Sequence, residues 1–198
     1  MDLEDYRTVF AVGSLILMLV GASPILSVVI PVSQSGERFS ELWVLGPTHV
    51  AENYPFNVSI GEEQRVFVGV GNHMGRSAYY LVYVKFRNQT QEGPDSASFS
   101  QSPLAPLYEF RFVIADGEKW EQHVFFSIIK ASNNESLSNI SELLIDNSAF
   151  EVNYLATWDS VNRGFYYQLF FELWMYDESV SNFQYQNHFV GLWLNITV

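Results

Sequence analysis

Four histidines are the side chains in this sequence best suited to acid–base or metal chemistry, and their spacing supports neither. They are His49, His73, His123 and His188, and no two of them form an HxH or HExxH pair. Zinc sites combine closely spaced His and Cys ligands, and this chain has no cysteine. We therefore expect surface or hydrogen-bonded structural histidines, with no metal ion and no cofactor.

The patterns that nucleophilic or phosphate chemistry requires are also absent from the sequence. It contains no GxSxG, no P-loop and no GxGxxG. The glycines in "GVGNHMG" (69–75) follow a predicted strand and open no helix, which indicates a hairpin turn. Carboxylates in "ADGE" (115–118) and "YDES" (176–179) could offer oxygens to Ca²⁺ but lack a spaced ligand pattern, which favours solvated turns. We predict that the protein is not an enzyme; a hydrolase with a site assembled from distant loops is the less favoured alternative.

Aromatic side chains are the remaining candidates for a binding site. On the predicted strands, one set of tyrosines and tryptophans falls on faces opposite to the core positions: Tyr79, Tyr83, Tyr166, Trp174, Tyr176 and Trp193. Exposed Tyr and Trp can stack on sugars or contact another protein. Alternatively, loops or a helix cover the same face, and the rings then serve only to pack it. The sequence leaves both alternatives open.

Period-two alternation of apolar residues predicts the strands that carry these rings. The clearest alternating runs are residues 66–70, 80–86, 108–114, 124–128, 165–175 and 190–196, with shorter runs at 42–45, 56–60 and 150–155. Turn-forming stretches separate them. Eight or so strands with frequent turns predict a mainly β fold, an antiparallel immunoglobulin-like β-sandwich.

Two segments between these strands have a different pattern. Residues 89–105 are rich in Ser, Gln, Gly and Pro and predict a long exposed loop. In residues 135–145, the spacing of Leu137, Ile140 and Leu143 suits a short amphipathic helix, the only helix expected in this part of the chain.

Composition limits the classes of partner. The net charge is −12, and an acidic surface repels phosphates, so we expect no nucleic acid among the partners. It also argues against attachment to an anionic membrane surface through a basic patch. Without cysteine, the domain has no disulfide and must be stabilised by its core.

Residues 9–32 contain no charged side chain and predict a transmembrane helix, because a bilayer core of roughly 30 Å needs about 20 apolar residues. A cleaved signal peptide is the alternative. Its start should be basic and its apolar region about 7–15 residues, whereas this chain begins "MDLEDYR" and the run is longer. The predicted organisation is a short cytoplasmic N-terminus (1–8), the helix (9–32), a short linker (33–38) and a β domain (39–198).

The topology rests on sequons rather than on flanking charges. Arg7 and Arg38 are the nearest basic residues on the two sides of the apolar run, so the positive-inside rule decides little. Five N-x-[ST] sequons support an extracellular domain and are candidate N-glycosylation sites: Asn57, Asn88, Asn134, Asn139 and Asn195. We therefore predict a single-pass cell-membrane protein with the N-terminus inside and the C-terminal domain outside.

The stretch "GERFSELWVLGP" (36–47), followed by "AENYPFNVSIGEEQRVFVGVGNHMGRSAYYLVYVKF" (51–86), resembles the archaeal membrane-protein family called domain of unknown function 1616. Trp120-Glu121 and the closing "GLWLN" (191–195) also match. The resemblance covers most of residues 36–198 and implies archaeal origin, a membrane anchor and an extracellular β domain. It implies no reaction, no catalytic residues and no cofactor. Many members carry several membrane helices, whereas one is predicted here.

Together these observations predict a membrane-anchored extracellular domain with a non-catalytic binding or structural role at the archaeal cell envelope. The expected partner is another envelope component, protein or glycan. The alternative is an accessory subunit of a membrane-embedded complex, such as an export or glycosylation machinery, with the helix as its docking element.

Overall fold

The computed structural model describes residues 6–7, 10–18 and 37–197. The chain divides into two units, residues 1–37 and 38–198. In the first unit, residues 10–18 are helical. Among the described residues, no helix combines the length and the apolar character needed to cross a bilayer. The predicted helix at 9–32 and the linker at 33–38 therefore lie for the most part outside the described residues.

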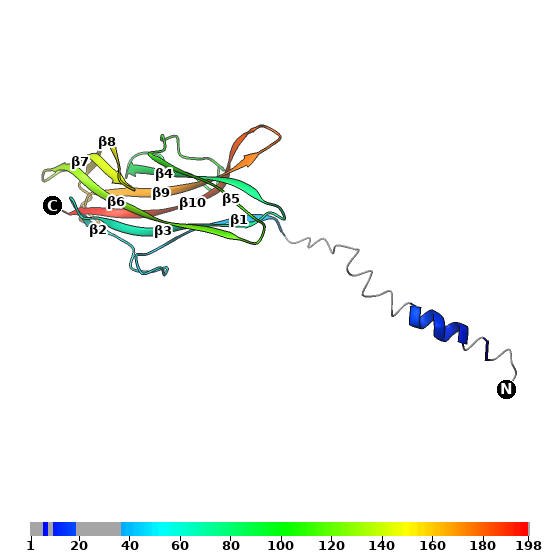
Figure 1. Cartoon of the computed structure of the whole chain (residues 1–198). Helices are drawn as coiled ribbons and strands as arrows, with labels where there is room; N and C mark the ends of the chain where they lie inside the picture. Colours follow the sequence, from blue (N-terminus) through cyan, green and yellow to red (C-terminus); the bar gives the residue numbers. More distant parts are fainter. Residues whose placement is uncertain (1–5, 8–9, 19–36, 198) are drawn as a thin grey trace. The chain divides into compact units, whose positions relative to one another are not determined.

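The second unit contains ten strands in two five-stranded sheets (Figure 1). The strands are β1 (Phe39–Leu45), β2 (Asn57–Ser59), β3 (Gln64–His73), β4 (Ala78–Asn88), β5 (Tyr108–Ile114), β6 (Lys119–Asn133), β7 (Leu137–Ile145), β8 (Ser148–Thr157), β9 (Tyr166–Asp177) and β10 (Asn182–Thr197). Sheet A has the order β1-β3-β6-β7-β8, and sheet B has the order β2-β10-β9-β4-β5. Neighbouring strands are antiparallel except β2 and β10, which are parallel. The predicted mainly β fold is confirmed.

The two sheets share one apolar core because apolar residues alternate along their strands. In β4 the residues facing the core are Tyr80, Val82, Val84 and Phe86, and all four are buried. Valines, leucines and phenylalanines from both sheets join them in a single cluster. Burying one such side chain contributes about 1.5–3 kcal/mol, so a core of this extent is the main source of stability in a chain without disulfides.

The helix predicted at 135–145 is wrong, since this segment forms β7. Its buried apolar residues include Ile140, Leu143 and Ile145. A register shift against β8 lies between Ile140 and Glu142. This irregularity inserts an extra residue into the alternation, so the two buried positions on either side are three apart instead of two. A spacing of three is also the helical spacing, which explains the wrong prediction.

The segment predicted as an exposed loop at 89–105 covers the outer face of sheet B at one point. Ser102 is buried there, and its backbone contacts two buried side chains of the sheet, Lys85 and Glu172. Other parts of the loop are exposed, among them Phe99. Polar composition therefore predicted the loop but not its packing against the sheet.

The domain has two ends with different elements. β1 starts at Phe39, which pairs with His73 at the end of β3, and the β9–β10 turn lies at this same end (Figure 1). The opposite end carries β2 beside the last residues of β10, together with the β6–β7 turn and the loop between β8 and β9 (Figure 1). We call this opposite end the distal end, because the chain enters the domain at Phe39.

Candidate functional site

All six aromatic residues predicted to form a binding surface lie on the outer face of sheet B. They alternate with core residues along three adjacent strands: Tyr79 and Tyr83 on β4, Tyr166, Trp174 and Tyr176 on β9, and Trp193 on β10. Tyr79 and Trp193 are exposed, and the other four are half-buried. The structure divides them into three groups along this face.

The central group packs around a buried ion pair. Lys85 and Glu172 are 3% and 0% exposed, with Lys85 Nζ 2.8 Å from Glu172 Oε2. Lys85 Nζ also donates to Ser102 O (2.9 Å), and Ser102 N donates to Glu172 Oε1 (2.7 Å). The pair therefore joins β4 and β9 to the covering loop.

Two of the predicted aromatic residues belong to this central group. The Tyr83 and Trp174 rings meet edge to face with centroids 5.5 Å apart, and the Trp174 and Tyr185 centroids are 5.7 Å apart. Burial, and secondarily the charge of Glu172, raises the pKa of Tyr185 to about 12. Tyr83 and Trp174 thus serve to pack the sheet beneath its covering loop.

A second group lies at the end where β1 begins. Tyr79, Tyr176 and Phe183 form a cluster in which the Tyr79–Phe183 centroids are 5.0 Å apart and the Tyr176–Phe183 centroids are 5.5 Å apart. The guanidinium of Arg111 lies 5.6 Å from the centre of the Phe183 ring. These rings pack against one another, and they line neither of the two pockets described below.

The third group forms a pocket at the distal end, which we call the distal aromatic pocket. It has a volume of about 370 Å³ and is lined by Phe56, Gln89, Asp159, Asn162, Tyr166 and Trp193. Trp193 is 40% exposed and Phe56 is 48% exposed. The Phe56 and Tyr166 ring centres are 6.1 Å apart. Of the six predicted aromatic residues, only Tyr166 and Trp193 line this pocket.

Hydrogen bonds fix the polar side of the distal aromatic pocket. Asp159 Oδ1 accepts from the backbone N–H groups of Val161 (2.8 Å) and Asn162 (3.1 Å), and Oδ2 accepts from Asn162 Nδ2 (2.7 Å). Hydrogen bonds from Asn162 hold the pKa of Asp159 below its usual range, and the bond from the Asn162 side chain has the largest effect. The Asp159 carboxylate is therefore ionised at neutral pH. Tyr166 Oη donates to Asn162 O (2.6 Å) and thereby ties the loop to β9.

The guanidinium of Arg87 lies over the Trp193 ring. The Arg87 guanidinium lies 5.1 Å from the centre of the Trp193 ring, a cation–π geometry. Arg87 Nε donates to Gln168 Oε1 (2.6 Å), and Nη1 donates to Gln91 O (2.6 Å). Desolvation lowers the pKa of Arg87, which nevertheless stays charged at neutral pH.

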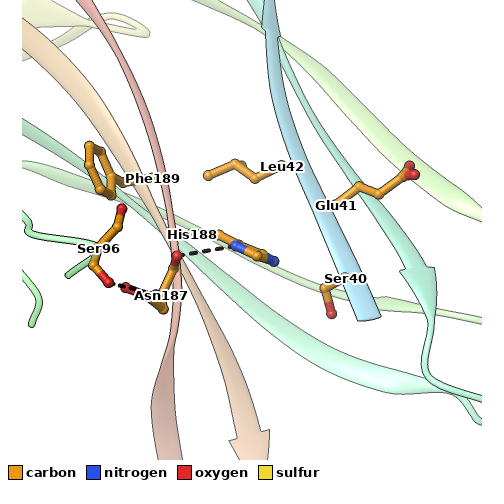
Figure 2. Close-up of a pocket in the computed structure, with 7 residues that line it drawn as sticks. All are labelled: Ser40, Glu41, Leu42, Ser96, Asn187, His188 and Phe189. Atoms are coloured by element: carbon orange, nitrogen blue, oxygen red, sulfur yellow. Dashed lines mark hydrogen bonds between the residues drawn. The ribbon is translucent and has the colours of Figure 1, made fainter. Parts of the chain in front are cut away.

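A different cavity, of about 420 Å³, lies where β1 approaches β10 (Figure 2). It is lined by Ser40, Glu41, Leu42, Ser96, Asn187, His188 and Phe189. Figure 2 shows Asn187 bonded to Ser96, with Nδ2 3.3 Å from Ser96 O, and His188 Nδ1 3.2 Å from Asn187 O. Its histidine therefore contacts a backbone carbonyl rather than a nucleophile, and the arrangement offers no base–nucleophile pair.

The histidines contact different elements, although His49 and His123 both lie against the Phe67 ring. His49 contacts the Glu121 carboxylate and packs on Phe67 with ring centres 4.6 Å apart. The His73 ring stacks on Phe39 at 4.7 Å. In the described part of the chain, no three His, Cys, Asp or Glu side chains are placed to hold a metal ion.

The structure places the five sequons in different environments. Asn134 and Asn57 are exposed, and Asn139 on β7 is half-buried. Asn88 is buried: its Nδ2 donates to Leu155 O (2.7 Å), and its Oδ1 accepts from Thr90 N (2.9 Å). Asn195 Nδ2 donates to Asn57 Oδ1 (2.9 Å). Asn57 and Asn134 are therefore the exposed acceptors, and the Asn88 side chain is engaged in internal hydrogen bonds.

Four residues of the distal aromatic pocket were not predicted from the sequence: Phe56, Gln89, Asp159 and Asn162. They come from three separate loops or strand ends, and no single sequence motif contains all four. Asp159, Val161 and Asn162 do form a local Asx-type turn, which its "WDSVN" residues could have indicated.

Two of the residues that carry the family resemblance, Asn72 and Tyr54, form hydrogen bonds with backbone carbonyl groups. Buried Asn72 donates from Nδ2 to Arg76 O (2.8 Å) and Ile114 O (2.9 Å), which ties two turns together. Tyr54 Oη donates to Val44 O (3.0 Å). Asn72 thereby links the end of β3 in sheet A to the end of β5 in sheet B, and both residues lie outside the distal aromatic pocket.

Comparison with known proteins gives one family. The model for "Domain of unknown function (DUF1616)" matches residues 33–148. The chain belongs to this family. The DUF1616 match includes β1 to β7 and ends before β9 and β10. Phe56 and Gln89 of the pocket therefore lie inside the DUF1616 match, whereas Asp159, Tyr166 and Trp193 lie beyond it.

Among curated proteins, none matches this DUF1616 chain in sequence. Two solved structures of a beta-glucosidase from Listeria innocua, in complex with glucose and with gluconolactone, match at 13% and 14% identity, with TM-scores of 0.33 and 0.32. Each match covers 59% of this chain and only 16% of the enzyme chain. Such TM-scores do not establish a shared fold.

Proposed function

We propose that this protein is a non-catalytic binding domain of the archaeal cell envelope. In this proposal the apolar residues 9–32 span the membrane, and the immunoglobulin-like domain that begins at Phe39 stands outside the cell. The uncharged run, long enough to span a bilayer core, and the exposed sequon at Asn134 support this arrangement.

The observation that carries the proposal is the distal aromatic pocket. It combines three aromatic rings with an ionised carboxylate and two amides in about 370 Å³, within the roughly 300–1,000 Å³ of typical ligand sites. Its lining residues come from the segments before β2 and after β4, from the β8–β9 loop, and from β9 and β10, and these elements meet at the distal end (Figure 1). A partner could therefore reach the pocket while the domain is held at its other end.

The chemistry of the pocket favours binding over catalysis. Asp159 and Tyr166 are its titratable residues, and both are engaged in hydrogen bonds that shape the loop. The pKa of Asp159 is lowered, which makes it a poor general base or acid at neutral pH. A binding site needs such fixed polar groups, whereas acid–base catalysis needs a pKa near the working pH.

Site-specific crosslinking on intact cells tests this proposal. A photo-reactive amino acid at Gln89, which lines the pocket, should give a defined adduct. The same group at Val113, which is 68% exposed on β5 and outside the pocket, serves as the matched control and should give none. No adduct from position 89, or equal adducts from both positions, would contradict the proposal.

A second candidate function is an accessory subunit of a membrane-embedded complex. It is favoured by the start of β1 at Phe39, because only residues 33–38 separate the strand from the apolar run. A domain held so close to the bilayer could contact other membrane proteins. Co-purification in mild detergent with and without residues 1–32 tests this. If the truncated protein retrieves the same partners, helix docking is not their basis.

A further inference from the structure

We infer that the distal aromatic pocket binds a neutral pyranose ring of a glycan. This inference rests on the proposed binding function and names the class of ligand. It depends on three properties of the pocket: the arrangement of its aromatic rings, the fixed hydrogen-bonding groups beside them, and the charge of the residues that line it.

The aromatic rings provide an apolar surface of the kind that a sugar ring can cover. Trp193 and Phe56 are 40% and 48% exposed, and Tyr166 lies 6.1 Å from Phe56 between ring centres. The faces of aromatic rings are electron-rich and attract the polarised C–H groups on one side of a pyranose. Arg87, engaged with Gln168 and Gln91, keeps Trp193 in place before any ligand arrives.

The polar groups beside the rings are held in fixed positions. Asp159 and Asn162 are locked together in one turn. Gln89 Nε2 donates to Thr157 O (3.0 Å), and Gln89 Oε1 accepts from Tyr166 N (3.3 Å), so its amide orientation is also determined. Carboxylate and amide groups together accept from and donate to vicinal hydroxyls. Little conformational entropy is then lost when a sugar binds.

The charge of the pocket selects a neutral sugar. Asp159 is its one charged lining residue, and the hydrogen bonds that lower its pKa keep it ionised. Arg87 lies over the Trp193 ring but is not a lining residue, and its guanidinium is already bonded to Gln168 and Gln91. Anionic ligands such as sugar phosphates or uronic acids would be repelled by the Asp159 carboxylate, in a chain of net charge −12. A neutral hexose or N-acetylhexosamine meets no such repulsion.

The test uses the full chain in a detergent that has no sugar headgroup. Methyl glycosides of glucose, galactose, mannose and N-acetylglucosamine, and their oligosaccharides, are added, and binding is measured by saturation-transfer NMR and tryptophan fluorescence. We expect at least one neutral glycoside to bind and Trp193→Ala to weaken it about tenfold or more, as expected for loss of a stacking ring.

Two further variants make the result specific to the pocket. Asp159→Asn removes the charge but keeps a side chain that can cap the turn, and it should weaken binding. This variant still tests the pocket if Trp193→Ala fails to fold. Tyr79→Ala removes an exposed ring from the same sheet face outside the pocket and should leave binding unchanged. Circular dichroism confirms that each variant is folded.

The outcomes separate this inference from the proposed function. If no glycoside binds but position 89 crosslinks to a protein, the pocket recognises a protein and the sugar inference is wrong. Glycoside binding that survives both Trp193→Ala and Asp159→Asn also overturns it, because the sugar then binds elsewhere. If neither a glycoside nor a crosslinked partner is found, the sugar inference and the proposed function fail together.

Discussion

Glu172 is a charged residue that is buried on the outer face of a sheet. It stands on the outer face of sheet B, where alternation predicts exposure, and yet it is 0% exposed and paired with Lys85. Its Oε2 atom is 2.8 Å from Lys85 Nζ but has no aligned hydrogen bond, so the contact is ionic, while Oε1 accepts from Ser102 N. Breaking such a pair costs more than the pair contributes, because one charge stays buried alone.

Lys85→Met should therefore destabilise the domain by about 3–5 kcal/mol. The substitution removes the positive charge and the donor to Ser102 O while it keeps an apolar chain of similar length. The free energy of unfolding is measured by denaturant titration followed by tryptophan fluorescence. Lys119→Met, at an exposed position on β6, is the control and should change stability by less than about 0.5 kcal/mol. Equal effects would show that the buried charge is not the cause.

The raised pKa of Tyr185 predicts that the free energy of unfolding falls at alkaline pH. Its folded-state pKa is about 12, above the ordinary value of 10.0, because burial and Glu172 disfavour the phenolate. The folded state therefore holds this proton more tightly than the unfolded state. Its contribution to stability is complete below pH 10 and is lost as the pH rises through about 12. Tyr185→Phe should make the fall in stability over this interval shallower, and an unchanged fall would mean that other tyrosines cause it.

At the scale of elements, the contact between β1 and β3 depends on a missing side chain. Trp43 pairs with Gly69, and a Cβ at position 69 would lie 2.1 Å from Trp43 Cε2. The indole also donates from Nε1 to Glu121 Oε2 (3.2 Å) on β6. The absence of a side chain at Gly69 thus lets one ring span three strands of sheet A.

Gly69→Ala should displace the Trp43 ring and destabilise the domain by about 1–3 kcal/mol, as overpacking does. Tryptophan emission and denaturant unfolding report the two effects. Gly71→Ala is the matched control on the same strand, where the nearest atom is Glu41 Oε2 at 2.7 Å, the end of a flexible side chain. Its cost should be smaller, and a cost as large as that of Gly69→Ala would contradict the role given to Trp43.

The alternation of apolar residues predicts regular strands correctly and fails where a strand contains a bulge. The runs at 80–86 and 108–114 became β4 and β5, because regular strands keep strict period two. The segment 135–145 did not, because the register shift near Glu142 breaks the period. A bulge is stabilised by pairing with a neighbouring strand, so the local sequence alone cannot reveal it.

At the scale of the whole molecule, the proposed topology has a direct test. Arg163 lies exposed in the loop between β8 and β9 at the distal end and offers a trypsin cleavage site. With the domain outside the cell, trypsin added to intact cells should cleave after Arg163. A cytoplasmic protein followed in the same sample should stay intact. Resistance of the chain before cell lysis, with cleavage after it, would reverse the predicted orientation.

The sequence by itself determined that the fold is mainly β and that the six aromatic residues share one face. Alternation of apolar residues depends only on which side of a strand each residue occupies, and it predicted the main strands and the shared face of the six aromatic residues. The lack of catalytic and metal-binding motifs is likewise a property of the sequence alone, because such motifs are defined by residue types at short spacings.

Only the tertiary structure decided which of these rings are packed and which line a pocket. The loop after β4 folds back over Lys85 and Glu172 and covers the middle of the face, while β2 pairs with the end of β10 and brings Phe56 near Trp193. The pocket joins residues from Phe56 to Trp193, and contacts over such a separation follow from strand order, which local sequence does not encode.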